Sequence, residues 1–337
     1  MQNPKILYSI TLLNKLLKKK KHSAVYLVTS AKVVKKLGWA IKEIGVSRKN
    51  IILIPDGEAA KEWDELRKLL GKFADLKIDR RSIVIAFGGG SVGDVTGFAS
   101  SVYLRGIKYV QMPTTLLAQV DSAHGGKTGI NFLHYKNQIG SFYQPLAIVL
   151  DTRLLTHLPR EQVIDGLGEI IKAGLIKDSS ILALLKREKA ATLMRSRRLK
   201  KIIEKSVQVK QYYVARDVKD TGIRQTLNFG HTVGHALELR HKISHGRAVL
   251  IGVLQELKIS ESLGVTPPSV RHNLIKLLDG LGVAVDQDFQ FAWGAVLRDK
   301  KVGRGVISLP IVEKEGKSKL IRLDLNALKK TVLGISK

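Results

Sequence analysis

Hydrophobic positions follow two different patterns along the chain, and the pattern changes near residue 155. In the first part, short apolar runs rich in β-branched residues alternate with stretches whose apolar residues lie three and four positions apart. Such runs predict strands, such stretches predict helices, and their alternation is typical of a parallel α/β sheet. The expected strands cover residues 23–30, 50–58, 82–90, 108–120 and 145–151, and the expected helices cover 31–45 and 62–76.

Long helical stretches dominate the second part, at residues 161–176, 199–218 and 230–243. With 337 residues the chain exceeds the roughly 250–300 residues at which a single core stops growing. We therefore expect α/β plus all-α architecture in two domains. A Rossmann-like parallel-sheet domain would cover residues 1–155, and a mainly helical domain would cover residues 156–337.

The chain has no cysteine, which excludes disulfides, thiolate metal ligands and a cysteine nucleophile. A bound metal would have to use histidine and carboxylate ligands. Lysines 18–21 follow the short apolar run at the N-terminus instead of preceding it, which is the wrong order for a secretory signal. No run approaches the roughly 20 apolar residues of a membrane span. We expect a cytoplasmic protein that does not bind membranes.

The formal net charge is +28, which raises the hypothesis of a nucleic-acid-binding protein. Lysine and arginine are scattered along the whole chain, however, with only short clusters at 18–22 and 195–201. No zinc-finger spacing or aromatic RNA-binding signature accompanies them. We predict no nucleic-acid partner. The positive field would instead raise the encounter rate with a multiply anionic substrate.

A glycine-rich loop follows the third expected strand. Gly88, Gly90 and Gly93 have the G-x-G-x-x-G spacing between a strand and an expected helix, where backbone amides can approach a pyrophosphate. The alternative is that these glycines only allow a tight turn. Asp94 follows just inside the helix and could cap amides or bind a hydroxyl group of a cofactor or substrate.

A second glycine-rich segment carries lysine. Lys127 follows two glycines in GGKTGIN, Asp121 precedes it, and Lys136 and Asn137 come shortly after. An ammonium group on such a loop is well placed to meet an anion, and a nearby carboxylate could orient it or bind a substrate hydroxyl. The alternative for each residue is a solvated loop charge.

Histidines and glutamates form the third group. His231 and His235 lie four apart on an expected helix and so share one face, with Glu238 one turn further on. Glu169 begins another helical stretch, and His245 follows in HGRAV. Such a set suits zinc or a related divalent ion with open coordination positions. Spacing alone makes His231 and His235 co-ligands, and the alternative is a pair of structural histidines.

Taken together, these motifs resemble the 3-dehydroquinate synthases, sugar-phosphate cyclases of the shikimate pathway, which leads to chorismate and the aromatic amino acids. The similarity extends from about residue 56 to 301, through PDGEAAK, GGGSVGDVTGFASSVYLRG, MPTTLLAQVDSAHGGKTGIN, KNQIGSFYQP, GEIIK, IRQTLNFGHTVGHALE, HGRAV and DKK. The resemblance implies an N-terminal NAD domain, a helical C-terminal metal- and substrate-binding domain, and a homodimer.

The resemblance also implies a reaction, the conversion of 3-deoxy-D-arabino-heptulosonate 7-phosphate to 3-dehydroquinate and phosphate. Transient oxidation by bound NAD, phosphate elimination, re-reduction and an intramolecular aldol closure make up the sequence, with zinc or cobalt as Lewis acid. In this family the metal would be held by Glu169, His231 and His245. His235 would then lie near the substrate phosphate and would not be a ligand.

The remaining site residues are likewise implied by the resemblance. NAD would be bound by Glu58, Lys61, Gly89, Gly90, Ser91, Val92, Asp94, Thr114, Thr115, Lys136 and Asn137. Substrate would be bound by Asp121, Lys127, Asn137, Lys172, Lys210, Arg224, Asn228, His235 and one or both of Lys300 and Lys301, with Arg105 reaching the phosphate from the partner subunit.

Some positions depart from the family pattern. Arg247 stands where the family usually has glutamate, next to the expected ligand His245, and reverses a charge near the metal. Val218, Asp220, His124 and Tyr135 also differ from the usual residues. None of these changes removes an expected ligand. Two alternative functions remain, a related cyclase acting on another sugar phosphate and a metal-dependent polyol or glycerol phosphate dehydrogenase, which would show net NADH turnover.

Overall fold

The computed structural model describes residues 4–133, 135–241, 243–286 and 306–324. The chain divides into two compact units, Met1–Leu158 and Pro159–Lys337. The division falls just before a proline, whereas the sequence pattern put it after residue 155. The first unit is α/β with a parallel sheet and the second is mainly helical, so the predicted fold class is confirmed.

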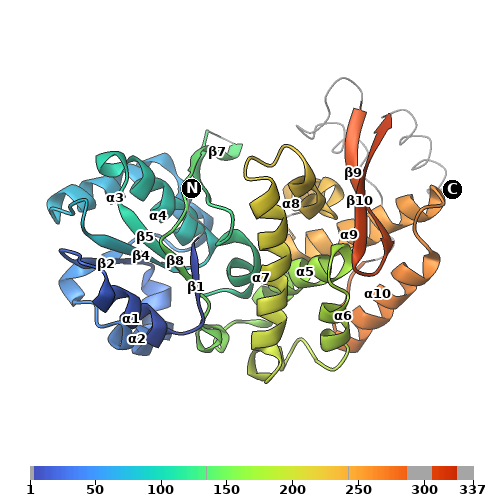
Figure 1. The fold of residues 1–337 in the computed structure, drawn as a ribbon, viewed down its shortest axis with the longest axis horizontal. Helices are drawn as coiled ribbons and strands as arrows, with labels where there is room; N and C mark the ends of the chain where they lie inside the picture. Colours follow the sequence, from blue (N-terminus) through green and yellow to red (C-terminus); the bar gives the residue numbers. More distant parts are fainter. Residues whose placement is uncertain (1–3, 134, 242, 287–305, 325–337) are drawn as a thin grey trace. The chain divides into compact units, whose positions relative to one another are not determined.

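In the described part of the first unit, six parallel strands form one sheet in the order β1-β8-β5-β4-β2-β3 (Figure 1). Five of them lie where apolar runs predicted strands. The short strand β1 was not predicted, and the run expected at 108–120 stops being a strand at Pro113. The strands are β1 (Lys5–Leu7), β2 (Val25–Thr29), β3 (Ile51–Leu53), β4 (Ile83–Gly88), β5 (Lys108–Pro113) and β8 (Ala147–Val149).

Helices cover both faces of this sheet because the strand side chains alternate between two apolar layers (Figure 1). In β2, Leu27 packs in the layer formed with α1 (Ile10–Lys19) and α2 (Ala31–Ile44). Its neighbours Tyr26 and Val28 pack in the opposite layer, with α3 (Trp63–Asp75) and α4 (Gly90–Val102). Burial on both faces explains why the strands read as continuous apolar runs.

The order of the strands defines where a ligand can bind. From β2 the chain passes through α2 to β3 at one edge, and from β4 it passes through α4 to β5 on the other side. The direction of winding therefore reverses between the neighbouring strands β2 and β4. In open α/β sheets, ligands bind outside the carboxyl ends of the strands at such a reversal. The glycine loop after β4 lies at this point.

A β-hairpin replaces the flexible loop expected around the lysine motif. Strands β6 (Lys127–Phe132) and β7 (Tyr135–Phe142) pair antiparallel, with Gly129 opposite Gly140. A Cβ atom on Gly129 would lie 2.8 Å from the carbonyl oxygen of Ile139, and one on Gly140 would lie 2.1 Å from that of Thr128. Glycine in GGKTGIN thus permits close strand pairing, and Lys127 starts a regular strand.

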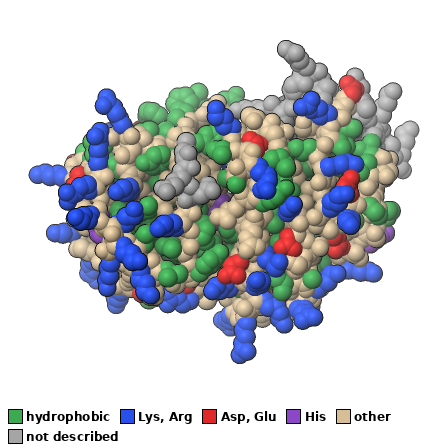
Figure 2. Space-filling view, viewed as in Figure 1, with side chains coloured by type: hydrophobic (Ala, Val, Ile, Leu, Met, Phe, Trp, Pro, Cys, Tyr) green, Lys and Arg blue, Asp and Glu red, His purple; other side chains and the backbone are tan. Residues whose placement is uncertain are grey.

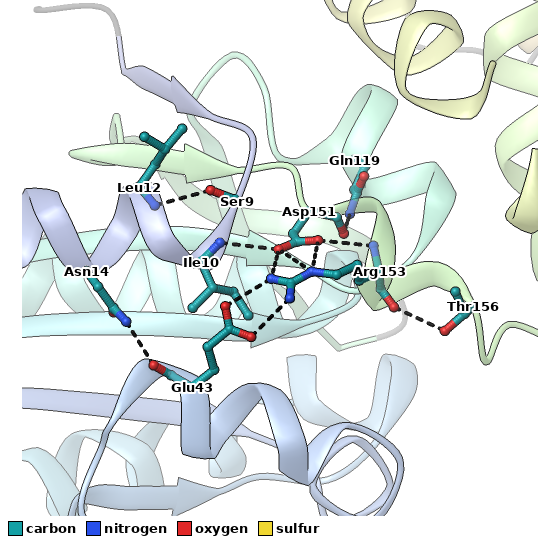
Figure 3. A network of polar contacts seen from close by, with 9 residues as sticks. All are labelled: Ser9, Ile10, Leu12, Asn14, Glu43, Gln119, Asp151, Arg153 and Thr156. Carbon is teal, nitrogen blue, oxygen red and sulfur yellow. Dashed lines mark hydrogen bonds and ion pairs between the residues drawn. The ribbon is translucent and has the colours of Figure 1, made fainter. Parts of the chain in front are cut away.

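A buried carboxylate after β8 anchors the first helix (Figure 3). Asp151 Oδ2 accepts the Ile10 amide at 3.2 Å, at the beginning of α1. The Arg153 guanidinium contacts Asp151 at 2.6 Å and Glu43 of α2 at 3.0 Å. This network joins the N-terminal helices of the unit to residues 151–153, which lie near the end of the same unit.

The second unit is built around α5, whose residues 166–176 are all buried (Figure 1). An antiparallel hairpin, which the sequence pattern did not predict, packs beside it: Ser318 donates to the carbonyl of Ile176 at 2.8 Å. The elements are α5 (Arg160–Ile176), α6 (Ser180–Leu185), α7 (Leu199–Arg216), α8 (His231–His241), α9 (His245–Ser262), α10 (Pro268–Leu281), β9 (Val306–Lys314) and β10 (Lys317–Asp324).

Lysine and arginine side chains spread across the face seen in Figure 2, and acidic side chains are few there. On this face the positive charge is thus spread and not gathered in one patch. Among the described residues, no helix has the length and apolar character needed to span a bilayer.

Candidate active site

The glycine loop presents backbone amides at the start of α4. Gly89 precedes the helix and has no side chain that could cap it. The first helical hydrogen bond runs from the Gly93 amide to the Gly89 carbonyl, at 3.1 Å. The amides of Gly90, Ser91 and Val92 precede that first helical bond and so point out of the helix end. Such an end, with its positive dipole, suits a phosphate group.

Close packing explains the glycines of this loop. A Cβ atom on Gly90 would lie 2.9 Å from the hydroxyl of Ser122, and one on Gly93 would lie 2.5 Å from Gln111 Oε1. Neither glycine has a positive φ angle, so no left-handed turn requires them. Close packing accounts for these two glycines without a left-handed turn. They let α4 lie directly against β5 and the π-helical turn Ala118–Ser122.

A buried lysine organises the polar groups beside the loop. Lys61, only 3% exposed, ends a short 3₁₀ helix after β3. Its Nζ donates to Asp94 Oδ2 at 2.8 Å and to Asn137 Oδ1, and lies 4.0 Å from Glu58. Burial raises the pKa of Asp94 to about 6, although the Lys61 charge acts to lower it. Three separate segments thus converge on one ammonium group.

Asn131 completes this cluster and was not assigned a role from the sequence. Its Nδ2 donates to Glu58 Oε1 at 3.0 Å, and its Oδ1 accepts the amide of Asn137 at 3.1 Å. Ser91 also donates to Glu58, at 3.2 Å. The position of Asn131 at the end of GGKTGIN was the available signal. Five predicted residues, Glu58, Lys61, Ser91, Asp94 and Asn137, are brought together in this way.

Other predicted residues of the first unit lie around the loop or on the surface. Thr114 is buried and its amide bonds to the Gly88 carbonyl at 2.9 Å. The methyl of Thr115 lies 3.3 Å from the position of a Cβ on Gly89. Asp121 is half-buried on the π-helical turn. Lys127, Lys136 and Arg105 are exposed, and Arg105 has a left-handed φ of 61°.

In the second unit, three helices each supply one residue to a compact group. Glu169 lies in α5, His231 is the first residue of α8, and His245 is the first residue of α9. One ligand atom from each lies within 4.8 Å of the others. His231 Nε2 is 3.4 Å and His245 Nε2 is 3.3 Å from Glu169 Oε1.

The other ring nitrogens have acceptors that orient both imidazoles. His231 Nδ1 donates to the carbonyl of Phe229 at 3.2 Å, and His245 Nδ1 donates to Glu238 Oε1 at 2.7 Å. Nδ1 is therefore occupied in each ring and Nε2 faces Glu169. Glu238 holding a ligand histidine was not recognised from the sequence, although its spacing in the GHALE segment was noted. Metal-binding histidines usually have such a partner.

The charges of this group are strongly coupled. Burial acts to raise the pKa of Glu169, but Lys172 and the two histidines hold that pKa well below its usual range. Burial, followed by the Lys172 charge, holds the pKa of His231 below its usual range. Burial also acts to lower the pKa of His245, but Glu169 and Glu238 together raise it to about 10.

The donor set fits a divalent metal. Two imidazoles and one carboxylate, with no thiolate, match a catalytic zinc or cobalt site with open positions. His235 lies in α8, but its side chain is outside the described residues, so the co-ligand role suggested by spacing stays untested there. The set brought together is the one that the family resemblance implied.

Lys172, a predicted substrate residue, lies beside this group. Lys172 is buried, contacts Glu169 through its Nζ, and donates to the carbonyl of Leu227 at 2.7 Å. That bond joins α5 to the 3₁₀ segment that contains buried Arg224 and half-buried Asn228. Lys210 is half-buried on α7. Lys300 and Lys301 lie outside the described residues.

Close backbone contact positions the start of α8. Gly230 has a φ of 78°, and a Cβ on Gly252 of α9 would lie 1.9 Å from its carbonyl oxygen. The buried carboxylate of Glu256 accepts the Gly230 amide at 2.8 Å. His231 follows directly, so contacts along α9 fix the position of His231 on α8.

Comparison with known proteins agrees with this geometry. Residues 51–165 match the family model described as 3-dehydroquinate synthase N-terminal, and residues 166–302 match that described as 3-dehydroquinate synthase C-terminal. The 3-dehydroquinate synthase of Dictyoglomus thermophilum is 38% identical over 83% of this chain and 81% of its own length. That of Azotobacter vinelandii is 42% identical, over 79% and 75%.

Two solved structures share the fold. The 2-epi-5-epi-valiolone synthase of Streptomyces hygroscopicus subsp. jinggangensis, with NAD+ and Zn2+ bound, has a TM-score of 0.85 and 23% identity, covering 100% of this chain and 97% of that one. A 2-deoxy-scyllo-inosose synthase complexed with carbaglucose-6-phosphate, NAD+ and Co2+ has a TM-score of 0.83 and 23% identity, covering 97% and 95%. The resemblance found in the motifs is confirmed, and the chain belongs to the 3-dehydroquinate synthase family.

Proposed function

We propose that this protein is a 3-dehydroquinate synthase that converts 3-deoxy-D-arabino-heptulosonate 7-phosphate to 3-dehydroquinate and phosphate. The observation that carries the proposal is the Glu169, His231 and His245 group, with its ligand atoms within 4.8 Å, in a chain 37–42% identical to proteins of that name. The reaction uses NAD transiently and returns the hydride, so no NADH accumulates.

Glu169, His231 and His245 would hold zinc or cobalt, the metals found in the two related structures. The metal would supply Lewis acidity to the substrate hydroxyl that is oxidised. Glu238 and the Phe229 carbonyl would keep the two rings oriented.

NAD would bind at the start of α4, with its pyrophosphate on the exposed amides of residues 90–92. The Lys61 cluster supports this assignment, because Asp94 and Glu58 are held rigidly beside the helix end and can accept hydrogen bonds from cofactor hydroxyls. Lys61 would fix these acceptors. Gly89, Thr114, Thr115, Lys136 and Asn137 would complete the cofactor site.

The substrate carries a carboxylate and a phosphate, and the proposed contacts are mostly cationic or amide groups. Their chemistry suits anion binding and the positioning of a departing phosphate. The +28 net charge would speed its capture at low salt. The proposed contacts are Asp121, Lys127, Asn137, Lys172, Lys210, Arg224, Asn228, His235, Lys300 and Lys301.

We further propose that the enzyme is a homodimer in which Arg105 reaches the phosphate of the partner's site. Mixing Arg105→Ala with Lys172→Met protein under exchange conditions tests this. A mixed dimer would contain one site with both residues intact, so the mixture should recover about a quarter of wild-type activity. No recovery from two inactive parents would place Arg105 in its own subunit's site, and an Arg105→Ala protein that is active alone would place it outside any site.

The function itself is tested by phosphate release from 3-deoxy-D-arabino-heptulosonate 7-phosphate, with catalytic NAD, Zn2+ or Co2+, and NADH absorbance followed in parallel. We expect equal amounts of phosphate and 3-dehydroquinate, abolished by chelation and by Glu169→Ala. Glu204→Ala, which removes a solvent-accessible carboxylate of α7, is the matched control and should remain active. Net NADH formation would indicate a polyol dehydrogenase, and phosphate release from another sugar phosphate only would indicate a different cyclase.

A further inference from the structure

One face of α5 meets α9 through four residues on three successive turns: Glu161, Asp165, and the adjacent Gly168 and Glu169. Positions separated by four, seven and eight residues share one side of a helix. Glu169 belongs to the metal group. The three earlier residues contact the first turn of α9, which begins with His245.

The first contact is an ion pair with two hydrogen bonds. Arg247 Nε donates to Glu161 Oε2 at 2.8 Å, and its Nη2 donates to Oε1 at 3.1 Å. Its Nη1 donates to the carbonyl of Ala284 at 2.9 Å. All three nitrogens of the guanidinium therefore have acceptors, and this planar fork holds the Arg247 side chain in one orientation.

The second contact caps α9 from a neighbouring helix. Ser244 precedes α9, but its side chain forms no cap. Asp165 Oδ1 instead accepts the amide of Gly246 at 3.0 Å. A carboxylate at a helix N-terminus is stabilised both by this bond and by the helix dipole.

The third contact is direct packing of backbone on backbone. A Cβ atom on Gly168 would lie 2.7 Å from the Gly246 carbonyl oxygen, and one on Gly246 would lie 2.2 Å from the Cα of Asp165. Backbone atoms cannot rotate away as a side chain can. The spacing and register of the two helices are therefore narrowly defined at this crossing.

Arg247 also has little direct effect on the charge at the metal group. Glu161 lies eight residues before Glu169 on α5, about 12 Å along the helix axis. The guanidinium is paired with the Glu161 carboxylate, which offsets its positive charge. The reversed charge expected from the family pattern is thus directed away from the ligands.

We propose that Glu161, Asp165 and Arg247 form a clamp that positions a metal ligand. The clamp holds the first turn of α9 on α5, so that His245 Nε2 stays within reach of Glu169 before the metal binds. This inference rests on the proposed metal centre. Arg247 is a positioning residue, acting through His245, which lies two positions before it.

The test is Co2+ binding to metal-stripped protein, followed by calorimetry and by the visible absorption of bound Co2+. We expect Arg247→Met and Glu161→Gln each to weaken Co2+ affinity at least about tenfold and to alter the spectrum, as loss of ligand support does elsewhere. The charge-swapped double variant Arg247→Glu with Glu161→Arg should restore both readouts toward wild type.

Arg271→Met is the matched control, because Arg271 binds both oxygens of Glu261 at 3.0 and 3.1 Å near the far end of α9. It should leave Co2+ binding unchanged. Wild-type affinity in Arg247→Met, an equal loss in Arg271→Met, or no recovery in the double variant would each overturn the clamp. Failure of wild-type protein to bind Co2+ more tightly than Glu169→Ala would instead remove the metal centre, and the clamp with it.

Discussion

Gly252→Ala tests whether helix spacing controls the metal group. The added methyl carbon would lie 1.9 Å from the carbonyl oxygen of Gly230 and 3.0 Å from the Gly234 amide nitrogen. Real Cβ atoms essentially never come closer than 3.0 Å, so α8 must move away from α9 by about 1 Å. His231 follows Gly230 directly and would move with it.

The magnitude follows from the nature of the contact. Overpacking costs about 1–3 kcal/mol when side chains can adjust, and here backbone must move, so we expect the free energy of unfolding to fall by about 3 kcal/mol. Metal sites need their ligands held within about 0.5 Å, so Co2+ affinity should fall at least about tenfold. Gly280→Ala is the control, since a Cβ there meets nothing within 4 Å. It should leave stability unchanged or raise it by up to about 1 kcal/mol.

Urea unfolding and Co2+ titration of both variants provide the measurements. The reasoning would be refuted by a Gly252→Ala protein that binds Co2+ as tightly as wild type, because His231 would then not depend on this contact. A loss of affinity in Gly280→Ala as well would show that any change in the unit disturbs the site.

Three further predictions concern other contacts. Glu238→Ala removes the acceptor for His245 Nδ1 and should weaken Co2+ binding about 10–100-fold, measured by titration, whereas Glu238→Gln keeps an acceptor oxygen and should lose less. Asp151→Ala removes the acceptor for the Ile10 amide and the contacts to Arg153, and should lower the free energy of unfolding by about 2 kcal/mol. The exposed Asp75→Ala should change it by less than about 0.5 kcal/mol in the same urea experiment. Asp94 has a raised pKa, so the folded protein binds its proton more tightly, and the stability this contributes is complete below pH 3.8 and lost as the pH rises through about 6. The stability of wild type relative to Asp94→Asn should therefore fall by about 2 kcal/mol between pH 4 and 7, and parallel pH curves would contradict it.

The sheet of the first unit was predictable because its strands are buried on both faces. Runs such as IVIAFG in β4 contain no charge and end in glycine, so their length and boundaries are visible locally. The hairpins were not. Strand β7 is largely exposed and carries polar residues, and β9 and β10 are stabilised by pairing with each other and by bonds to α5. Such pairing depends on distant contacts that periodicity does not record.

The candidate site was likewise predictable where the signal is local and not where it depends on contacts between distant segments. The glycine loop could be placed from its strand–helix context, but Asn131 could not be recognised, because its role depends on Glu58 and Asn137 meeting it in space. Arg247 shows the opposite error. Its sequence position beside His245 suggested a charge near the metal, whereas its side chain binds Glu161 on another helix. Two positions along the chain place the Arg247 backbone near His245, but they do not determine where a long arginine side chain points.

Spacing on one helix does not by itself identify the residues that the fold brings together. Positions four apart share a face, yet a metal needs ligand atoms that converge, and Glu169 and His245 come from other helices. His231 and His245 are both first residues of helices, and each has a glycine neighbour in the chain, Gly230 or Gly246, that lies at a backbone contact. Glycine lets the helix ends approach closely enough for short imidazole side chains to reach one carboxylate. In this fold, a glycine at a backbone contact stands next to each histidine of the group formed by Glu169, His231 and His245.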